Sequence, residues 1–548
     1  MLQNAVGPNI DSTPPQLETL HRCFRIPEII LQVFAAVSVQ DSPNATLAAL
    51  ARTCRLFEQP ALEYLWSDPG THTLDYVLNC LPHGLFTGNR YHDVLSLSRA
   101  IRSSDWERPR RYCNLVRTLS VSYGKTHKQL ATLGQFYPEL CLFPQLRQLV
   151  ICGYDTMHLQ EPLLRTLLSP TLKHIELDEV YLQTISLFPI IIHRAPQLTT
   201  LIFDAYPGLN GPIDHAEALS ELLQSLHHLQ VLTLAHTDDT MLSHVSRLRK
   251  LRKLTINRLD LPVASQSTTL QALDSLGTFP SLETLSVARV NLRALTAVIQ
   301  LIRISPLRKL DICPLPESHL TTADTTAFCR SVGAYINRQT LQQFDYQLRS
   351  HHRYPVSLVH VDISADAFRS LQDFPGLTHL YMQCDGKYSV NDGLMDDLAR
   401  SWPALETFTL CPSKTNSARK TIKLTLVSLV AFATHCSRLV ALNMSFDATA
   451  LPSTMAVDGS GEPVIQTSLV RLSTGYSPIR DPVKVAHFLS RLFPRLDLIK
   501  SSHCVDSDSD DSDSVSESAP HPGRPHGSKL YAACWKDVAA KLAAATAT

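Results

Sequence analysis

Apolar residues recur in one short pattern along most of the chain. Each copy has an apolar residue, two variable residues, a second apolar residue, one variable residue and a third apolar residue. Copies start mostly 22 to 34 residues apart, and one gap of 36 residues contains a weaker copy at Leu358/Val361/Ile363. The other copies are Val116/Leu119/Val121, Leu146/Leu149/Ile151, Leu172/Ile175/Leu177, Leu198/Leu201/Phe203, Leu229/Leu232/Leu234, Leu251/Leu254/Ile256, Leu282/Leu285/Val287, Leu307/Leu310/Ile312, Leu341/Phe344/Tyr346, Leu377/Leu380/Met382, Leu405/Phe408/Leu410, Leu439/Leu442/Met444 and the incomplete Leu469/Leu472 and Leu496/Ile499.

This pattern predicts a stacked array of short strands. The last two apolar positions lie two residues apart, so both side chains point to the same side of a strand. One copy cannot bury that side alone, whereas neighbouring copies can form a parallel sheet over one continuous core. The expected fold is an α/β leucine-rich-repeat solenoid over residues 115–500, with the parallel sheet on the concave side and helices on the convex side. An ordinary α/β domain would not repeat one signature so often.

The segments between the copies have the spacing of amphipathic helices. Four such segments are 216–226, 292–304, 322–336 and 484–493. Many copies are preceded by an apolar residue and a proline, which ends a helix and begins the turn toward the next strand. These pairs are Phe143-Pro144, Ala195-Pro196, Phe279-Pro280, Phe374-Pro375 and Trp402-Pro403.

Residues 23–68 have a different pattern, which predicts two or three short helices. Pro27 suits the first position of a helix, where its missing N–H costs nothing, and Ser42 suits the cap of a second helix at Pro43. Two apolar stripes follow, Ile26, Ile30, Val33, Phe34 and Leu47, Leu50, Cys54, Phe57. So small a domain buries little core of its own. We therefore expect an apolar stripe, including Ile30, to be exposed and completed by a partner.

These elements resemble the F-box. The match runs from Arg25-Ile26-Pro27-Glu28-Ile29-Ile30 through Leu47-Ala48-Ala49-Leu50-Ala51-Arg52-Thr53-Cys54-Arg55-Leu56-Phe57 to Leu65-Trp66. Ile26 and Phe57 replace the commoner Leu and Trp, and the usual Asp-Leu ahead of the second helix is missing. A small all-α F-box followed by irregular leucine-rich repeats is similar to the large F-box family of mushroom-forming (basidiomycete) fungi.

The resemblance implies a substrate-recognition subunit of an SCF-type cullin-RING E3 ubiquitin ligase. Its F-box would dock a Skp-type adaptor, and through it a cullin, while the repeats would bind a protein substrate. The adaptor-binding residues it implies are Ile26, Pro27, Glu28, Ile30, Val33, Phe34, Leu47, Leu50, Cys54 and Arg55. Two alternatives stay open: a leucine-rich-repeat scaffold without a ubiquitin role, and a helical segment that only caps the solenoid.

One position departs from the usual repeat. Repeats of this class carry Asn three residues after the third apolar position, where its side chain hydrogen-bonds the turns of neighbouring units. Here the corresponding residues are Tyr154, Val180, Thr237, Leu259 and Val290. The array thus resembles the irregular, longer-repeat subclass found beside F-boxes.

Four further segments complete the expected layout. Residues 1–22 are expected to be disordered, and residues 69–114 to form a linker with capping helices. Residues 501–528 are rich in Ser and Asp and too polar to bury a core, so we expect an acidic disordered segment. Residues 529–548 are rich in Ala and predict a short C-terminal helix or tail.

Composition limits the possible partners and compartments. The chain has 50 Lys+Arg against 50 Asp+Glu, which argues against nucleic acid or an anionic membrane as a partner. The first residues lack the basic and apolar stretches of a secretory signal, and no window resembles a membrane span. Thirteen cysteines without a CxxC pair favour buried free thiols in a reducing compartment. We expect a cytoplasmic and/or nuclear protein.

Signatures of catalysis and metal binding are missing from the sequence. GxSxG, GxxxxGK, GxGxxG and HExxH do not occur. Residues 506–517 imitate a calcium loop, but Asp511 stands where the turn needs Gly. The pairs His227-His228 and His351-His352 have no further ligand at suitable spacing. We expect no enzymatic activity, no cofactor and no metal.

The residues that alternate with the apolar positions are expected to face the concave side. They are mostly neutral and polar, which suits a protein surface better than phosphate or nucleic acid. The expected substrate-binding residues are Gln343, Asp345, His379, Tyr381 and Gln383, with Tyr381 as aromatic anchor. Loops at residues 350–356 or 455–464 are the alternative.

Overall fold

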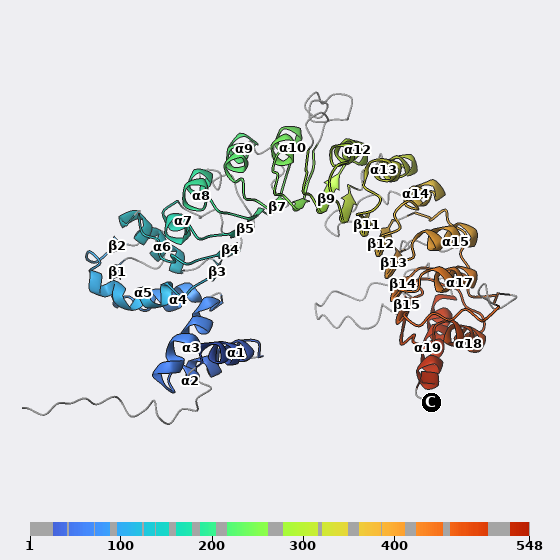
Figure 1. Cartoon of the computed structure of the whole chain (residues 1–548), viewed down its shortest axis with the longest axis horizontal. Coiled ribbons are helices and arrows are strands. Elements are labelled where there is room, and N and C mark those ends of the chain that lie inside the picture. The colour runs from blue at the N-terminus through green and yellow to red at the C-terminus, as the bar shows by residue number, and fades with distance from the viewer. Residues whose placement is uncertain are drawn as a thin grey trace, which may run out of the picture. The chain divides into compact units, whose positions relative to one another are not determined.

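The computed structural model forms two compact units, Met1–Thr200 and Leu201–Thr548, each described here by itself (Figure 1). It describes residues 26–40, 43–70, 72–87, 96–122, 125–137, 139–152, 161–177, 187–203, 216–260, 278–315, 320–348, 361–384, 386–411, 423–452, 461–501 and 527–546. The N-terminal stretch 1–22, most of the acidic stretch 501–528, the loop 350–356, most of the loop 455–464 and the Ser42 cap lie outside these residues.

The fold is an α/β solenoid of the leucine-rich-repeat type. Its main sheet has 14 strands whose order follows the order in the chain, and the strand pairs described are parallel. The strands are β3 Thr118–Ser122, β4 Gln148–Cys152, β5 His174–Leu177, β6 Thr200–Phe203, β7 Val231–Leu234, β8 Lys253–Ile256, β9 Thr284–Val290, β10 Lys309–Pro314, β11 Gln343–Gln347, β12 His379–Gln383, β13 Thr407–Cys411, β14 Ala441–Asn443, β15 Arg471–Ser473 and β16 Leu498–Lys500. Within each unit the helices line one side of the strands and leave the other side, the concave one, uncovered (Figure 1).

The repeat positions form the core that the sequence predicts. Every described apolar residue of the complete copies is buried, and Leu254 is 1% exposed while Lys253 beside it is exposed. Ile499, in the last incomplete copy, is only half-buried. The phase of the strands is therefore confirmed.

The weaker copy in the long gap is not a strand of the sheet, so that prediction is wrong. Gln343 and Phe344 of β11 pair directly with His379 and Leu380 of β12, which leaves no room for an intervening strand. Ile363 is buried and forms only an isolated bridge. A local apolar pattern cannot distinguish a buried turn from a strand.

Neighbouring repeats are joined by the same backbone hydrogen bonds again and again. The carbonyl before most of the strands accepts two amides from the next repeat, as Gln230 O does from Arg252 N at 2.8 Å and Lys253 N at 2.9 Å. The turn into each strand closes locally, as where Leu377 N donates to Phe374 O at 3.1 Å. The apolar residue that stands before the proline in each expected pair, Phe374 among them, is buried. Backbone groups that would otherwise lack partners are thus satisfied within the stack.

The four predicted helices of the repeat region are present. They are α9 Ala216–Ser225, α12 Leu292–Leu301, α13 Thr322–Tyr335 and α18 Pro482–Leu492. The other helices that the structure describes in this region are α6 Lys125–Phe136, α7 Glu161–Leu167, α8 Phe188–Arg194, α10 Asp239–Ser246, α14 Ala365–Arg369, α15 Asp392–Ser401 and α17 Leu426–His435. Several begin at a side-chain cap, as where Thr321 accepts from Asp324 N at the start of α13.

Apolar packing occupies the place of the missing Asn side chains. Thr237, Leu259 and Val290 are buried and connected by successive parallel bridges. Arg258 O accepts from Thr237 N, and Val290 O accepts from Leu315 N. Backbone bonds and apolar contacts therefore join these turns; Tyr154 and Val180 lie outside the described residues.

Three short helices form the N-terminal helical module, α1 Pro27–Ser38, α2 Pro43–Leu50 and α3 Arg55–Ser67. Pro27 opens α1 as expected. The second stripe does not lie on one helix, so that prediction is wrong: Arg52 and Thr53 donate side-chain hydrogen bonds to Ala48 O and Leu50 O, and the chain turns. Cys54 is extended and begins α3, so Phe57 belongs to the next helix.

Short elements connect the helical module to the repeats. They are α4 Thr73–Leu78, the antiparallel pair β1 Phe86–Thr87 and β2 Ser96–Leu97, a 3-10 helix Ser103–Trp106 and α5 Glu107–Cys113. Trp66 of α3 stacks on Tyr112 of α5 with ring centroids 4.5 Å apart. Arg117 N, just before β3, donates to Ser67 O at 2.9 Å. The module is thus fixed to the first repeat by side-chain and backbone contacts.

The alanine-rich C-terminal stretch, for which the sequence allowed a helix or a tail, forms α19 Gly527–Thr546. It packs against α18 and β16 of the last repeat. Trp535, Val538 and Leu542 are buried, and Trp535 Nε1 donates to Ser477 O at 2.9 Å. This helix therefore covers the end of the core, as the terminal units of repeat proteins require. Among the described residues, no helix combines the length and apolarity needed to cross a membrane.

Candidate protein-interaction surfaces

The expected substrate-binding residues are neighbours on the uncovered side of β11 and β12. We call Gln343, Asp345, His379, Tyr381 and Gln383 the strand face. The register places Gln343 beside His379 and Asp345 beside Tyr381. Each of these side chains is half-buried, while the residues that alternate with them are buried in the core. The sequence therefore predicted both their proximity and their orientation.

The surroundings of Asp345 on the strand face shift the pKa of its carboxyl. Burial raises the pKa of its carboxyl above the usual value; Asp311, its register partner on β10, acts in the same direction, and Lys309 opposes both. The Lys309 Nζ lies 3.5 Å from Asp345 Oδ2. Asp311 in turn accepts from Ser286 Oγ at 3.2 Å. Asp345 therefore has a carboxylate as its neighbour on β10 and one cation within ion-pair distance.

Tyr381 presents an aromatic ring held by polar neighbours. Its hydroxyl donates to Gln383 Oε1 at 3.0 Å. His379 Nδ1 lies 2.8 Å from Thr378 Oγ1. Residues of this kind, with a rigid ring and adjacent hydrogen-bonding groups, are common anchors in protein interfaces.

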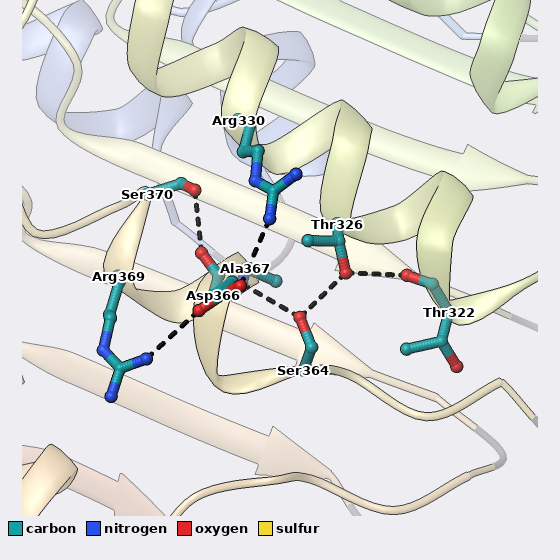
Figure 2. A network of polar contacts seen from close by, with 8 residues as sticks. All are labelled: Thr322, Thr326, Arg330, Ser364, Asp366, Ala367, Arg369 and Ser370. Atoms are coloured by element: carbon teal, nitrogen blue, oxygen red, sulfur yellow. Dashed lines mark hydrogen bonds and ion pairs between the residues drawn. The ribbon is translucent and has the colours of Figure 1, made fainter.

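A polar network connects two helices on the helical side of the sheet (Figure 2). Thr326 of α13 contacts Ser364, the cap of α14, at 2.8 Å between hydroxyl oxygens. Ser364 Oγ accepts from Ala367 N, and Asp366 accepts from Arg330 at 3.2 Å and from Arg369 at 3.1 Å. The network joins the helices before and after β11. Sequence reasoning missed it, although Ser364 three residues before Ala367 has the spacing of a helix cap.

The described residues do not assemble a metal site: no group of three His, Cys, Asp or Glu side chains is placed to hold an ion. Burial raises the pKa of the Cys329 and Cys436 thiols to about 12, so both are protonated at neutral pH. The pair His351-His352 lies outside the described residues.

The helical module buries three of the ten expected adaptor contacts and exposes five of them, and the other two are half-buried. Ile30, Phe34 and Leu47 form its core with Ala61, so the expected exposed stripe through Ile30 is wrong. The reason is that α3 closes over α1: the Phe34 and Phe57 rings lie 5.7 Å apart, and the Tyr64 hydroxyl donates to Leu31 O.

The remaining expected contacts lie at the surface of the module. Ile26 is 46% and Val33 42% exposed, and Pro27, Glu28 and Arg55 are also exposed. Leu50 and Cys54 are half-buried. Leu31, at 45% exposure, is an apolar surface residue that sequence reasoning missed. The exposed apolar side chains at and just before α1 are Ile26, Pro27, Leu31 and Val33, which we call the α1 surface; Leu31 and Val33 lie on opposite edges of the buried side, because they are two residues apart.

Comparison with known proteins adds little to this description. No family model and no curated protein matches the sequence. The chain is similar to one in the crystal structure of the Rad7 and Elc1 complex in yeast, with 13% identity and a TM-score of 0.30 over 70% of this chain and 75% of that chain. At this sequence identity and TM-score, no activity or partner of that protein is assigned to this chain. Strand register and burial themselves define a leucine-rich-repeat solenoid preceded by a small helical module.

Proposed function

We propose that the chain is a non-enzymatic receptor that joins a protein substrate to a ubiquitin ligase. In this proposal the helical module is an F-box that docks a Skp-type adaptor and, through it, a cullin of an SCF-type ligase. The strand face holds the substrate. The chain contributes proximity rather than chemistry, because holding two reactants together raises their effective concentration.

The observation that carries the proposal is the α1 surface. Three large apolar side chains, Ile26, Leu31 and Val33, are each more than 40% exposed on a helix that also buries Ile30 and Phe34 in its own core. Exposed apolar side chains on a helix that already buries Ile30 and Phe34 suit a module that folds by itself and docks a partner. The F-box resemblance identifies the expected partner.

The strand face supports the substrate half of the proposal. Its polar, hydrogen-bonding side chains surround one aromatic ring and are held by strands with a fixed register. Rigid arrangement of such groups lowers the entropy lost on binding. This surface suits a protein partner.

The test separates docking from folding. We expect Pro27→Ala with Val33→Asp to abolish co-purification with the adaptor, because a charge in a desolvated interface costs about 3–5 kcal/mol. Thermal unfolding should be unchanged, since Val33 lies outside the core of the module. Val39→Asp is the matched control: Val39 follows the same helix, is 84% exposed and should leave binding intact.

Undiminished adaptor binding by the double variant would contradict the F-box assignment. If the wild-type chain binds no Skp-type adaptor, the alternative is a leucine-rich-repeat scaffold without a ubiquitin role. Ile30→Asp should instead unfold the module, because its side chain is 4% exposed.

A further inference from the structure

The turn between α10 and β8 carries a dense group of exposed cations. Residues 247–258 contain six basic side chains, and all six are exposed. They are Arg247, Arg249, Lys250, Arg252, Lys253 and Arg258. The whole chain has equal numbers of basic and acidic residues, so this density does not follow from a basic composition. We call Arg249, Lys250, Arg252 and Lys253 the basic turn.

Apolar anchors fix the direction of these side chains. Leu248 and Leu251 are buried on either side of Arg249 and Lys250, and Leu251 N donates to Leu248 O at 3.2 Å. Arg252 N donates to Gln230 O, which ties the turn to the preceding repeat. The backbone is therefore fixed by the core, and the four cations are held outward on a rigid support.

Partners within the described residues neutralise only part of this charge. Arg258 pairs with Asp260 at 2.9 Å, while the Arg252 guanidinium is 3.9 Å from Glu283. Lys250 Nζ contacts His228 Nδ1 at 3.0 Å, which supplies no negative charge. The described residues provide no ion pair for Arg249 or Lys253.

The dipole of α10 explains little of this arrangement. A helix C-terminus attracts cations only within its last turn. Arg247 is the C-cap of α10, whereas the basic turn lies beyond it, and Lys253 already begins β8. Interaction with the dipole of α10 therefore does not account for the excess positive charge at the basic turn.

We propose that the basic turn is a docking site for a short acidic segment of a partner protein. Its positive surface is confined to about one repeat: the register partner of Lys253 on β9 is Thr284, preceded by Glu283, and the preceding turn carries His227 and His228. A nucleic-acid backbone would need cations along a longer track. This site does not depend on the adaptor or the strand face.

The test uses the full chain and a fluorescent peptide of about 12 residues, alternating Glu and Gly, followed by fluorescence anisotropy. The wild type should bind it at least about tenfold more tightly than the corresponding Gln peptide, and binding should weaken from about 0.05 M to about 0.5 M salt. The variant Arg249→Gln, Lys250→Gln, Arg252→Gln should lose about tenfold in affinity.

The control variant, Arg491→Gln, Arg495→Gln, Lys500→Gln, removes the same charge from other exposed positions of the same unit and should change affinity less than about twofold. Equal loss in both variants, or no preference for the Glu peptide at low salt, would overturn the proposal. If a single-stranded DNA of equal charge binds more tightly than the Glu peptide, the basic turn is a nucleic-acid site and the proposal is overturned. Melting curves of both variants should match the wild type, because the three substituted side chains in each variant are exposed.

Discussion

Ile30 and Val33 are both apolar and three residues apart on α1, but the structure buries the first and exposes the second. Apolar spacing indicates which residues share one side of a helix. It does not reveal whether that side meets the chain's own core or another protein. The position of α3, which places Phe57 and Tyr64 against Phe34, decides the matter. The sequence therefore predicted the module but misassigned Ile30, Phe34 and Leu47.

A second residue-scale feature, close backbone approach, leaves no hydrophobic signal. Gly333 lies in α13 where this helix approaches Ser370 at the end of α14. A Cβ at this position would lie 2.4 Å from Ser370 O, a contact that backbone atoms cannot relieve by rotation. Only a residue without a side chain lets these two helices pack at this distance.

We expect Gly333→Ala to lower the free energy of unfolding by about 1–3 kcal/mol, because the two helices must separate. Gly393→Ala is the control, since a Cβ there would be 3.7 Å from the nearest atom, an ordinary contact. Alanine favours helix over glycine, so the control should be neutral or stabilising by about 0.5–1 kcal/mol. Thermal unfolding of both variants checks this, and equal effects would contradict the packing described for Gly333.

Among the elements, α19 shows what periodicity can and cannot provide. Its alanine-rich sequence predicts a helix, but not the surface it covers. Trp535 is decisive: its ring meets Phe446 edge-on at 5.9 Å and its indole N–H reaches Ser477 O. These partners lie 89 and 58 positions earlier, as the difference in residue numbers shows. Nothing local in the sequence encodes such a contact.

We expect Trp535→Ala to destabilise the C-terminal repeats by about 3–5 kcal/mol through lost packing. Trp535→Phe retains most of the packing and loses one hydrogen bond, which costs about 1 kcal/mol. Leu530→Ala on the same helix should change stability by less than about 0.5 kcal/mol, because Leu530 is 63% exposed. Hydrogen exchange of β15 and β16 measures the effect locally. If the amides of β15 and β16 exchange as slowly in the Trp535→Ala variant as in the wild type, α19 has no capping role.

For the whole molecule, the repeat pattern predicted the fold class and the alternation of buried and exposed residues because each copy occupies the same environment. The repeat pattern failed at Val361 and Ile363. Both residues have its apolar spacing and are buried, but they do not form a strand of the sheet. The pattern also left the basic turn unnoticed, because three of its four cations lie before β8 rather than along the strand. The strand face itself was predicted, since register follows from stacking identical units.

At this scale, we expect substrate capture and adaptor binding to be separable. Tyr381→Ala with Gln343→Ala should weaken substrate capture by about tenfold or more, because a central aromatic residue contributes about 2 kcal/mol or more. Adaptor binding should be unchanged, since both positions belong to the second unit and the helical module to the first. Quantitative mass spectrometry of proteins bound to the full chain provides the measurement.

Thr233→Ala with Thr255→Ala is the matched control for that variant, because both residues face the same side of the sheet on β7 and β8. It should leave capture unchanged. If the Tyr381 and Gln343 double variant retains every captured protein at wild-type abundance, the strand face is not the substrate site. The loops over 350–356 and 455–464 then become the place to search.

The packing of α19 also sets an order of events during biosynthesis. A ribosome makes the strands and α18 before it makes α19, and 26 residues, 501–526, separate β16 from that helix. Translation at about 5–20 residues per second delays the helix by a few seconds. Throughout that interval Phe446 and its neighbours present apolar surface to the solvent, which is the kind of surface that chaperones bind. The nascent chain becomes independent of such protection only when Trp535 arrives and closes the last repeat.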